Sequence, residues 1–294
     1  MTPSDEVTGS DPTELDPLYV EARRVLLDAL AALAPHDTAI VLAGAQAIYL
    51  RTGAGDIAVA PYTTDGDLVV DPMLLSAEPE IEAAMMAAGF RLAIADNGHI
   101  EPGIWVTESD IGGEPFLIPV DLIVPEGNAP PGGRRGARLG PHGNKAARRA
   151  RGLEAALVDK SPMTVSALDP NDRRSVTVDV AGAAALLVAK AHKLHDRVAG
   201  GKPGRLDDKD AADVVRIMQT TSPTAVGSTL KTLFEHPIAG QPSEDALQYL
   251  DELFGRRGAP GIQMAARSLQ VGIPEDRVEA ICIAYMSALR DAVN

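Results

Sequence analysis

Apolar and polar residues follow two different patterns along this chain. In the first 180 residues, short apolar runs rich in β-branched residues are separated by segments that contain Gly and Pro, which is typical of strands joined by turns. From residue 181 onward, apolar positions recur every three or four residues, as on one face of an amphipathic helix. The patterns therefore predict an α+β protein, in which a mixed β-sheet with flanking helices is followed by an all-α C-terminal part.

The individual elements follow from the same patterns. An apolar series with helical spacing, from Leu18 to Leu33, predicts a first helix over residues 18–33. Strands are predicted at residues 38–42, 67–70, 90–95, 104–107, 116–124, 155–158, 163–167 and 175–180. Further helices are predicted at residues 46–51, 78–88, 183–198, 208–219, 224–234, 243–254, 261–268 and 275–292. We expect a disordered acidic lead at residues 1–13, a first domain at 14–180 and a helical domain at 181–294.

The overall charge narrows the classes of function. The 294 residues include 27 Lys and Arg against 41 Asp and Glu, a formal net charge of −14. This balance excludes a uniformly basic protein that coats nucleic acid, but it leaves a local basic patch open. Aromatic residues make up 3%, which disfavours a sheet that stacks bases. The single cysteine, Cys282, excludes a disulfide framework and a cysteine-rich zinc site.

The apolar runs and the N-terminal composition predict where in the cell the protein is located. No apolar run approaches the roughly 18 residues that a membrane helix needs. The first twenty residues carry acids, Pro and Ser where a signal segment would be basic and apolar. We therefore expect a cytoplasmic protein without membrane contact.

Three features of the first half share one chemistry. The turn at Gly44, Ala45 and Gln46 joins a strand to a helix, so its backbone could approach a phosphate at the helix N-terminus; a purely structural turn is the alternative. Asp65 and Asp67 are two residues apart at the entry to an apolar strand, so both carboxylates are expected to face one site. Adjacent carboxylates repel each other unless a cation lies between them, and Mg²⁺, or Mn²⁺ in its place, is suited to that position. Solvated acids flanking the strand are the alternative.

A third carboxylate, Asp121, interrupts the apolar run 119–124. Val120 and Leu122 are expected to face the core, which places Asp121 on the opposite face of the strand. A carboxylate inside an apolar strand is costly to bury unless it is paired or bound to a metal. An exposed edge strand is the alternative.

The helical half adds a group of charged residues. Leu187, Ala191, Leu194 and Val198 form the expected buried stripe of the helix at 183–198. Three cations are expected along one flank of this stripe: Lys190, Lys193 and Arg197. Asp210 and Asp213 are three residues apart and share a face of the next predicted helix. For each of these charges, a solvated helix surface is the alternative.

Together these motifs resemble a known family. A Gly-containing turn, Asp65-Gly66-Asp67 and a later-strand carboxylate, Asp121, are similar to the parts of the polymerase-β nucleotidyltransferase superfamily. The segment from Lys193 to Asp213 resembles the second-half motifs of the AbiE-type nucleotidyltransferase toxins, which include MenT-like members. The resemblance covers roughly residues 41–218. It implies a nucleotidyltransferase-type sheet, a helical domain that closes the active-site cleft, and metals held by the three aspartates.

The same resemblance implies roles for individual residues. Lys193 is implied to contact the nucleoside triphosphate, with Lys190 as the competing lysine. Asp213 is implied to be essential and a candidate base, with Asp210 in support. His192 and His195 are interpreted as helix-surface residues, or as neighbours of the site, ahead of metal ligands. The implied reaction transfers a nucleoside monophosphate to an acceptor hydroxyl, most often on RNA and in MenT-like members at the tRNA 3′ end.

One segment departs from the acidic composition. No acid occurs between Ala129 and Leu153, and this stretch, interpreted as a loop and a following helix, contains seven cations: Arg134, Arg135, Arg138, Lys145, Arg148, Arg149 and Arg151. They would suit the phosphate backbone of an RNA acceptor. Docking to an acidic partner or balancing of the chain's own acids are the alternatives.

These observations lead to one hypothesis and two rivals. The hypothesis is a translation-blocking nucleotidyltransferase toxin, paired with an antitoxin, that uses NTP and Mg²⁺ to modify RNA. The first rival is transfer to a small molecule or a protein. The second is a catalytically silent binding protein, which the absence of a hydroxyl on Ala45 and the twenty residues between Gly44 and Asp65 favour.

Overall fold

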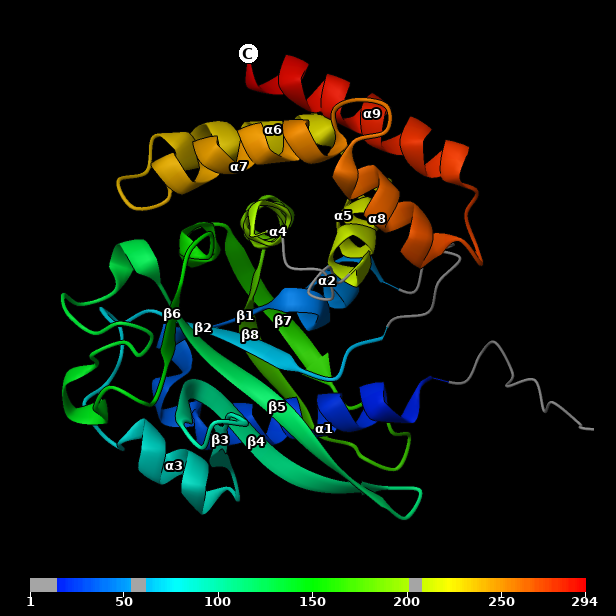
Figure 1. Cartoon of the computed structure of the whole chain (residues 1–294). Coiled ribbons are helices and arrows are strands. Elements are labelled where there is room, and N and C mark those ends of the chain that lie inside the picture. The colour runs from blue at the N-terminus through cyan, green and yellow to red at the C-terminus, as the bar shows by residue number, and fades with distance from the viewer. Residues whose placement is uncertain (1–14, 54–61, 201–207) are drawn as a thin grey trace, which may run out of the picture.

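A computed structural model describes residues 15–53, 62–200 and 208–294 of the chain. In these ranges a mixed β-sheet is covered by helices, several of which come from the C-terminal part (Figure 1). The coarse prediction of an α+β protein is therefore confirmed. The predicted lead at residues 1–13 lies outside the described residues.

The sheet contains eight strands within the described ranges. They are β1 (Ile40–Ala43), β2 (Gly66–Val70), β3 (Arg91–Ile94), β4 (Ile100–Ile111), β5 (Glu114–Pro125), β6 (Arg148–Ala150), β7 (Lys160–Ser166) and β8 (Ser175–Ala181). The order across the sheet is β3-β4-β5-β2-β1-β8-β7, and β6 pairs with β5. The pairs β1–β2, β3–β4, β4–β5 and β7–β8 are antiparallel, whereas β1–β8, β2–β5 and β5–β6 are parallel.

The middle of the sheet is apolar because its strands are covered on both faces. All four residues of β1 are buried, and so are Leu68, Val69 and Val70 of β2. Such continuous apolar runs are typical of strands in the interior of an α/β sheet. In the register of these strands, Ala43 pairs with Asp67 and Asp67 with Asp121. Two carboxylates therefore occur side by side on neighbouring strands, next to the buried apolar residues of β1 and β2.

The helices of the first half are α1 (Pro17–Ala32), α2 (Gly44–Thr52) and α3 (Ile81–Ala87). Helix α1 begins after Asp16, whose carboxylate accepts a hydrogen bond from the Leu18 amide at 2.8 Å. It packs against β2, β4, β5 and β8 through an apolar face. Helix α2 follows β1 without an intervening loop, so its N-terminus lies at the end of the sheet that carries Asp67.

The C-terminal part is helical throughout its described residues. Its helices are α4 (Ala183–Ala199), α5 (Asp208–Thr220), α6 (Pro223–Phe234), α7 (Gly240–Phe254), α8 (Pro260–Leu269) and α9 (Glu275–Val293). Helix α4 lies between the sheet and the helices α6 and α7, and it contacts α2, α5, α6 and α7 (Figure 1). Helix α4 thus contacts both α2 of the first half and the other helices of the C-terminal part.

Three local predictions are wrong. The segment predicted as a strand at 155–158 belongs to a 3₁₀-helix, η4 (Glu154–Leu157), because the chain turns there beneath α4 and does not extend along the sheet. No helix follows the loop in the cationic segment; its end forms β6. Val198, assigned to the buried stripe of α4, is 38% exposed near the C-terminal end of that helix.

None of the helices in the described ranges combines the length and the apolar character that crossing a membrane requires.

Candidate functional site

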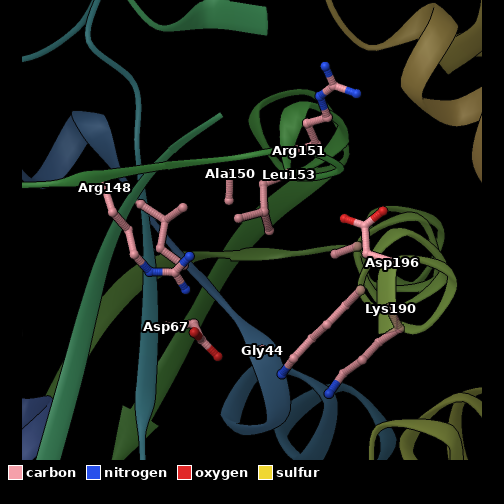
Figure 2. Close-up of a pocket in the computed structure, with 11 residues that line it drawn as sticks. Gly44, Asp67, Arg148, Ala150, Arg151, Leu153, Lys190 and Asp196 are labelled. Carbon is pink, nitrogen blue, oxygen red and sulfur yellow. The ribbon is translucent and has the colours of Figure 1, made fainter. Parts of the chain in front are cut away.

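A cavity of about 300 Å³ lies between the carboxylate end of the sheet and helix α4 (Figure 2). It is lined by Gly44, Asp67, Ile123, Arg148, Ala150, Arg151, Leu153, Ala189, Lys190, Lys193 and Asp196. Six of the predicted site residues are among them: Gly44, Asp67, Arg148, Arg151, Lys190 and Lys193. A volume of this size is at the lower end of the range for small-molecule sites.

The carboxylates come from two neighbouring strands. Asp67 lies on β2 and its register partner Asp121 on β5. Asp65 immediately precedes β2, where its carboxylate accepts a hydrogen bond from the hydroxyl of Thr63. The buried, apolar neighbours Val120 and Leu122 confirm that Asp121 lies on the opposite face from them.

These acids are close enough to change one another's ionisation. Desolvation of its carboxyl group, together with the negative charges of Asp65 and Asp121, raises the pKa of Asp67 to about 7. Burial also raises the pKa of Asp121, although the Arg148 guanidinium opposes this shift. Among the described residues, no hydrogen bond to the Asp67 carboxylate is formed. A desolvated, like-charged pair of carboxylates favours a cation in the adjoining space.

Gly44 allows the Asp67 carboxylate to lie against the start of α2. Its φ of +65° belongs to the left-handed region that L side chains rarely adopt. A Cβ atom at this position would lie 1.9 Å from Asp67 Oδ2. Close approach between the α2 backbone and the carboxylate therefore requires glycine here.

Substitution of Gly44 should reveal this close approach. We expect Gly44→Ala to destabilise the fold more than Gly53→Ala, by about 1–3 kcal/mol of additional overpacking cost. Gly53 is a matched control: it ends the same helix with a φ of +66°, but a Cβ there would meet nothing within 4 Å. Urea denaturation measures the difference, and Asp67→Ala should relieve it in the Gly44→Ala background. Equal losses for the two single variants would contradict the proposed clash.

The other two residues of the predicted phosphate turn lie outside the cavity. Ala45 is buried in the core, and Gln46 is 1% exposed. The Gln46 side chain accepts a 2.7 Å hydrogen bond from Arg23 Nε and donates a 3.3 Å bond to the backbone oxygen of Asp65. Gln46 thus does not line the cavity, and its amide holds the segment that carries Asp65.

The two lysines of α4 have different environments. The Lys190 ammonium is buried and donates hydrogen bonds to Asp210 Oδ1 at 2.5 Å and Asp213 Oδ2 at 2.7 Å. The Lys193 side chain is 47% exposed, and its ammonium lies 3.0 Å from Asp210 Oδ2. Figure 2 shows Lys190 extending from α4 towards Gly44. Lys193 is thus the lysine with freedom to meet a ligand.

The aspartates of α5 form ion pairs with the cations of α4. Asp210 contacts Lys190, Lys193 and Arg197, so the predicted cationic flank of α4 and the shared face of Asp210 and Asp213 are both confirmed. Burial alone lowers the pKa of Lys190, but Asp213 and Asp210 outweigh it and raise that pKa above its ordinary value. Burial likewise raises the pKa of Asp210, and the three cations more than reverse the shift. Asp213 itself is buried against Lys190 and does not line the cavity.

The cationic segment 134–151 is divided by the fold. Arg148 and Arg151 line the cavity, and Arg148 donates two hydrogen bonds to Asp121. Arg149 pairs with Glu126 at 2.8 Å and Arg135 with Glu101 at 2.9 Å. The side chains that the structure leaves exposed on the loop are Arg134, Arg135, Arg138 and Lys145. Part of the set therefore balances acids of the same chain.

Sequence reasoning missed one wall of the cavity. Ile123, Ala150, Leu153 and Ala189 line it with apolar atoms, and Asp196 lies at its edge. Gly152, with a φ of +81°, turns the chain between Ala150 and Leu153 and lies so close to α4 that a Cβ would meet His192 at 2.6 Å. Single apolar residues in a loop carry no chemical pattern, so only the fold identifies them.

The two histidines of α4 lie beside helix α7. His192 is buried and its Nε2 lies 2.8 Å from the backbone oxygen of Pro242, which corrects the expectation of a helix-surface position. The His195 ring stacks on Tyr249 with 3.7 Å between ring centroids. Both rings thus contribute to the packing of α4 on α7.

The chemistry of the carboxylates suits a hard divalent cation. Asp65, Asp67 and Asp121 offer oxygen ligands of the kind that Mg²⁺ and Mn²⁺ prefer. As the side chains stand, no three His, Cys, Asp or Glu residues within the described ranges are spaced to hold a metal ion together. The guanidinium of Arg148 lies against Asp121 in this arrangement.

The chain was compared with known proteins. No protein-family model matches it, and neither a curated protein nor a solved structure matches it.

Proposed function

We propose that this chain is a metal-dependent nucleotidyltransferase with the nucleotidyltransferase-type fold, which transfers a nucleoside monophosphate from an NTP to a hydroxyl of RNA. One observation carries the proposal: Asp67, which lines the cavity, is the register partner of Asp121 on the neighbouring strand, and the half-exposed side chain of Lys193 lines the same cavity. Acids that can hold a cation and a cation that can meet phosphate are the two halves of a triphosphate site. The motif resemblance described above gives the same reaction class.

In this proposal, Asp65, Asp67 and Asp121 hold Mg²⁺. The bound metal would neutralise charge on the triphosphate and favour an ionised acceptor hydroxyl. Lys193 neutralises charge on the β- and γ-phosphates. Lys190 helps to position Lys193, because both lysines pair with Asp210. The backbone at Gly44 and the start of α2 give the phosphates an electropositive surface.

In the proposed transfer, one bond to phosphorus forms and one breaks. The acceptor oxygen forms a bond to the α-phosphorus, the bond from that phosphorus to the bridging oxygen breaks, and pyrophosphate leaves. The hydroxyl proton passes to a carboxylate. We assign this role to Asp121, because it is the register partner of Asp67, which lines the cavity, whereas Asp213 is engaged with the buried Lys190 ammonium. The apolar wall at Ile123 and Leu153 offers a surface for the nucleoside and keeps water from that side.

The acceptor and the biological role are inferred from the resemblance to AbiE-type toxins. RNA, in particular the 3′ end of tRNA, is the proposed acceptor, and block of translation the proposed outcome. A cognate antitoxin is the corresponding proposed partner. The residues that can contact RNA phosphates are Arg151 at the edge of the cavity and the exposed cations of the loop, Arg134, Arg135, Arg138 and Lys145.

The test is a transfer assay with each of the four α-labelled NTPs, Mg²⁺ and total bacterial RNA. We expect one NTP to label RNA of tRNA size, with loss of label in EDTA and in the Lys193→Met variant. A parallel reaction with RNA-free protein extract identifies the competing acceptor class. Label in protein or in a small molecule alone would overturn the RNA acceptor but keep the reaction. An absence of label from every acceptor would overturn the reaction and favour a silent binding protein.

A further inference from the structure

Arg148 occupies the carboxylate site. It lies on β6, which pairs with β5 so that Arg148 is the register partner of Ile123, two residues after Asp121. Its Nε and Nη2 atoms both donate to Asp121 Oδ2, at 3.1 and 2.8 Å. Figure 2 shows its guanidinium pointing towards Asp67. A side chain expected to contact RNA is therefore placed inside the cavity, on the acids.

The positive charge of Arg148 compensates these acids. It lowers the pKa of both Asp67 and Asp121, in each case against a larger upward shift from burial. A guanidinium does not lose its proton in proteins, so this compensation cannot be removed by deprotonation. It can be removed only by movement of the side chain. The Arg148 side chain is 25% exposed, its stem is long and unbranched, and it already lines the open cavity.

We propose that Arg148 is the resident counter-cation of the carboxylate site and exchanges between Asp121 and the phosphates of the nucleotide. A divalent cation and the guanidinium compete for the same carboxylate oxygens, so entry of the cation releases Arg148. The released guanidinium is held in the cavity by its strand, where its paired donors fit phosphate oxygens. This inference rests on the proposed function, and it assigns to Arg148 an anion-binding role in that reaction.

The competing interpretation is a permanent structural ion pair between Arg148 and Asp121. The two interpretations predict different changes in metal and phosphate binding when Arg148 is removed. A counter-cation obstructs the metal and assists the phosphates, so its removal should strengthen metal binding and weaken phosphate binding. A structural pair keeps Asp121 in place, so its removal should weaken both or change neither.

The experiment compares Arg148→Gln with Arg149→Gln in the full chain. Arg149 is the adjacent residue on β6, pairs with Glu126 and does not line the cavity, so it controls for loss of an arginine from this strand. Binding of Mn²⁺ alone is followed by its paramagnetic resonance signal. Binding of inorganic tripolyphosphate at saturating Mn²⁺ is followed by calorimetry, which makes the result independent of the base and of catalysis.

We expect Arg148→Gln to bind Mn²⁺ about 3- to 10-fold more tightly than wild type, because one competing positive charge is gone. We expect the same variant to bind tripolyphosphate about tenfold or more weakly, through loss of charge-assisted hydrogen bonds. Arg149→Gln should match wild type in both measurements. Arg148→Lys, which keeps the charge, should bind Mn²⁺ as wild type does and serves if the glutamine variant does not fold.

Weaker or unchanged Mn²⁺ binding by folded Arg148→Gln, with wild-type binding intact, would overturn this inference and leave the proposed function standing. Unchanged tripolyphosphate binding would do the same. A wild-type chain that binds neither Mn²⁺ nor tripolyphosphate would overturn the proposed function together with the inference.

Discussion

Replacing Lys190 by methionine should destabilise the fold by about 3 kcal/mol or more, since it removes the cation between two buried carboxylates and leaves their charge uncompensated. Methionine keeps the length and apolar stem of the side chain, so packing changes little. Asp210 retains Lys193 and Arg197, whereas Asp213 loses the ammonium it contacts at 2.7 Å. Urea denaturation of the purified variant measures the loss.

Lys193→Met is the matched control on the same helix. Its side chain is 47% exposed, so its ion pair with Asp210 is screened by solvent, and we expect a loss below about 1 kcal/mol. The transfer assay should rank the two variants differently, because Lys193→Met removes the proposed phosphate contact and should keep the fold. The double variant Lys190→Met/Asp213→Asn should recover part of the lost stability. Equal destabilisation by the two single variants would show that Lys190 is not the buried centre of this cluster.

Asp67→Asn should abolish nucleotide transfer and at the same time stabilise the protein at alkaline pH. In the proposed reaction Asp67 would help to hold the metal, so its loss should remove several kcal/mol of transition-state stabilisation, which is about 10²- to 10⁴-fold in rate. The gain in stability has a separate cause. Ionised Asp67 is desolvated and faces Asp65 and Asp121, so the folded state carries a repulsion that the unfolded chain lacks.

The pH dependence follows from a pKa of about 7 in the folded state, against an ordinary value of 3.8. Below pH 4 the group is protonated in both states and contributes nothing. Between pH 4 and 7 the folded state binds more protons, so its stability falls as the pH rises, and above pH 7 the full penalty is present. Asp67→Asn should remove this penalty, roughly 2–4 kcal/mol at pH 8.5.

Thermal unfolding in EDTA at pH 4.5, where most of the penalty has yet to develop, and at pH 8.5 measures this effect. The excess stability of Asp67→Asn should be several degrees at pH 8.5 and much smaller at pH 4.5. Asp71→Asn is the control: it changes an acid just beyond the same strand, one that accepts hydrogen bonds from the Met73 amide and Asn128, and it should lower stability and keep transfer. A destabilised Asp67→Asn protein at pH 8.5 would show that this carboxylate supports the fold.

Elements with a strong apolar period were predictable from the sequence. The helix predicted at 183–198 is α4 (Ala183–Ala199), and the strand at 67–70 is β2 (Gly66–Val70), because each pattern matches the burial of its element. The failures have local causes. Residues 155–158 are apolar, but the chain there turns at η4 under α4, and a run of four cannot distinguish a buried turn from a strand.

The sequence was enough to identify the acids of the site, but not to predict which of its cations are buried or paired. Asp67 and Asp121 stand out because carboxylates rarely interrupt buried strands, and they prove to be register partners. Whether a lysine faces ligand or core depends on packing: Lys190 and Lys193 differ by less than one helical turn, yet one is buried and the other exposed. Gln46 and Arg148 contact partners far away in sequence, which no local spacing reveals.

The arrangement of charges on α4 and α5 has a consequence for how an anion encounters this protein. The group formed by Lys190, Lys193, Arg197, Asp210 and Asp213 places three cations against two carboxylates. It therefore has one surplus positive charge in a chain whose formal net charge is −14. An approaching polyphosphate is repelled by the net negative charge of the molecule and is attracted only close to these cations. Anions that cannot come that close are therefore not retained at this wall of the cavity.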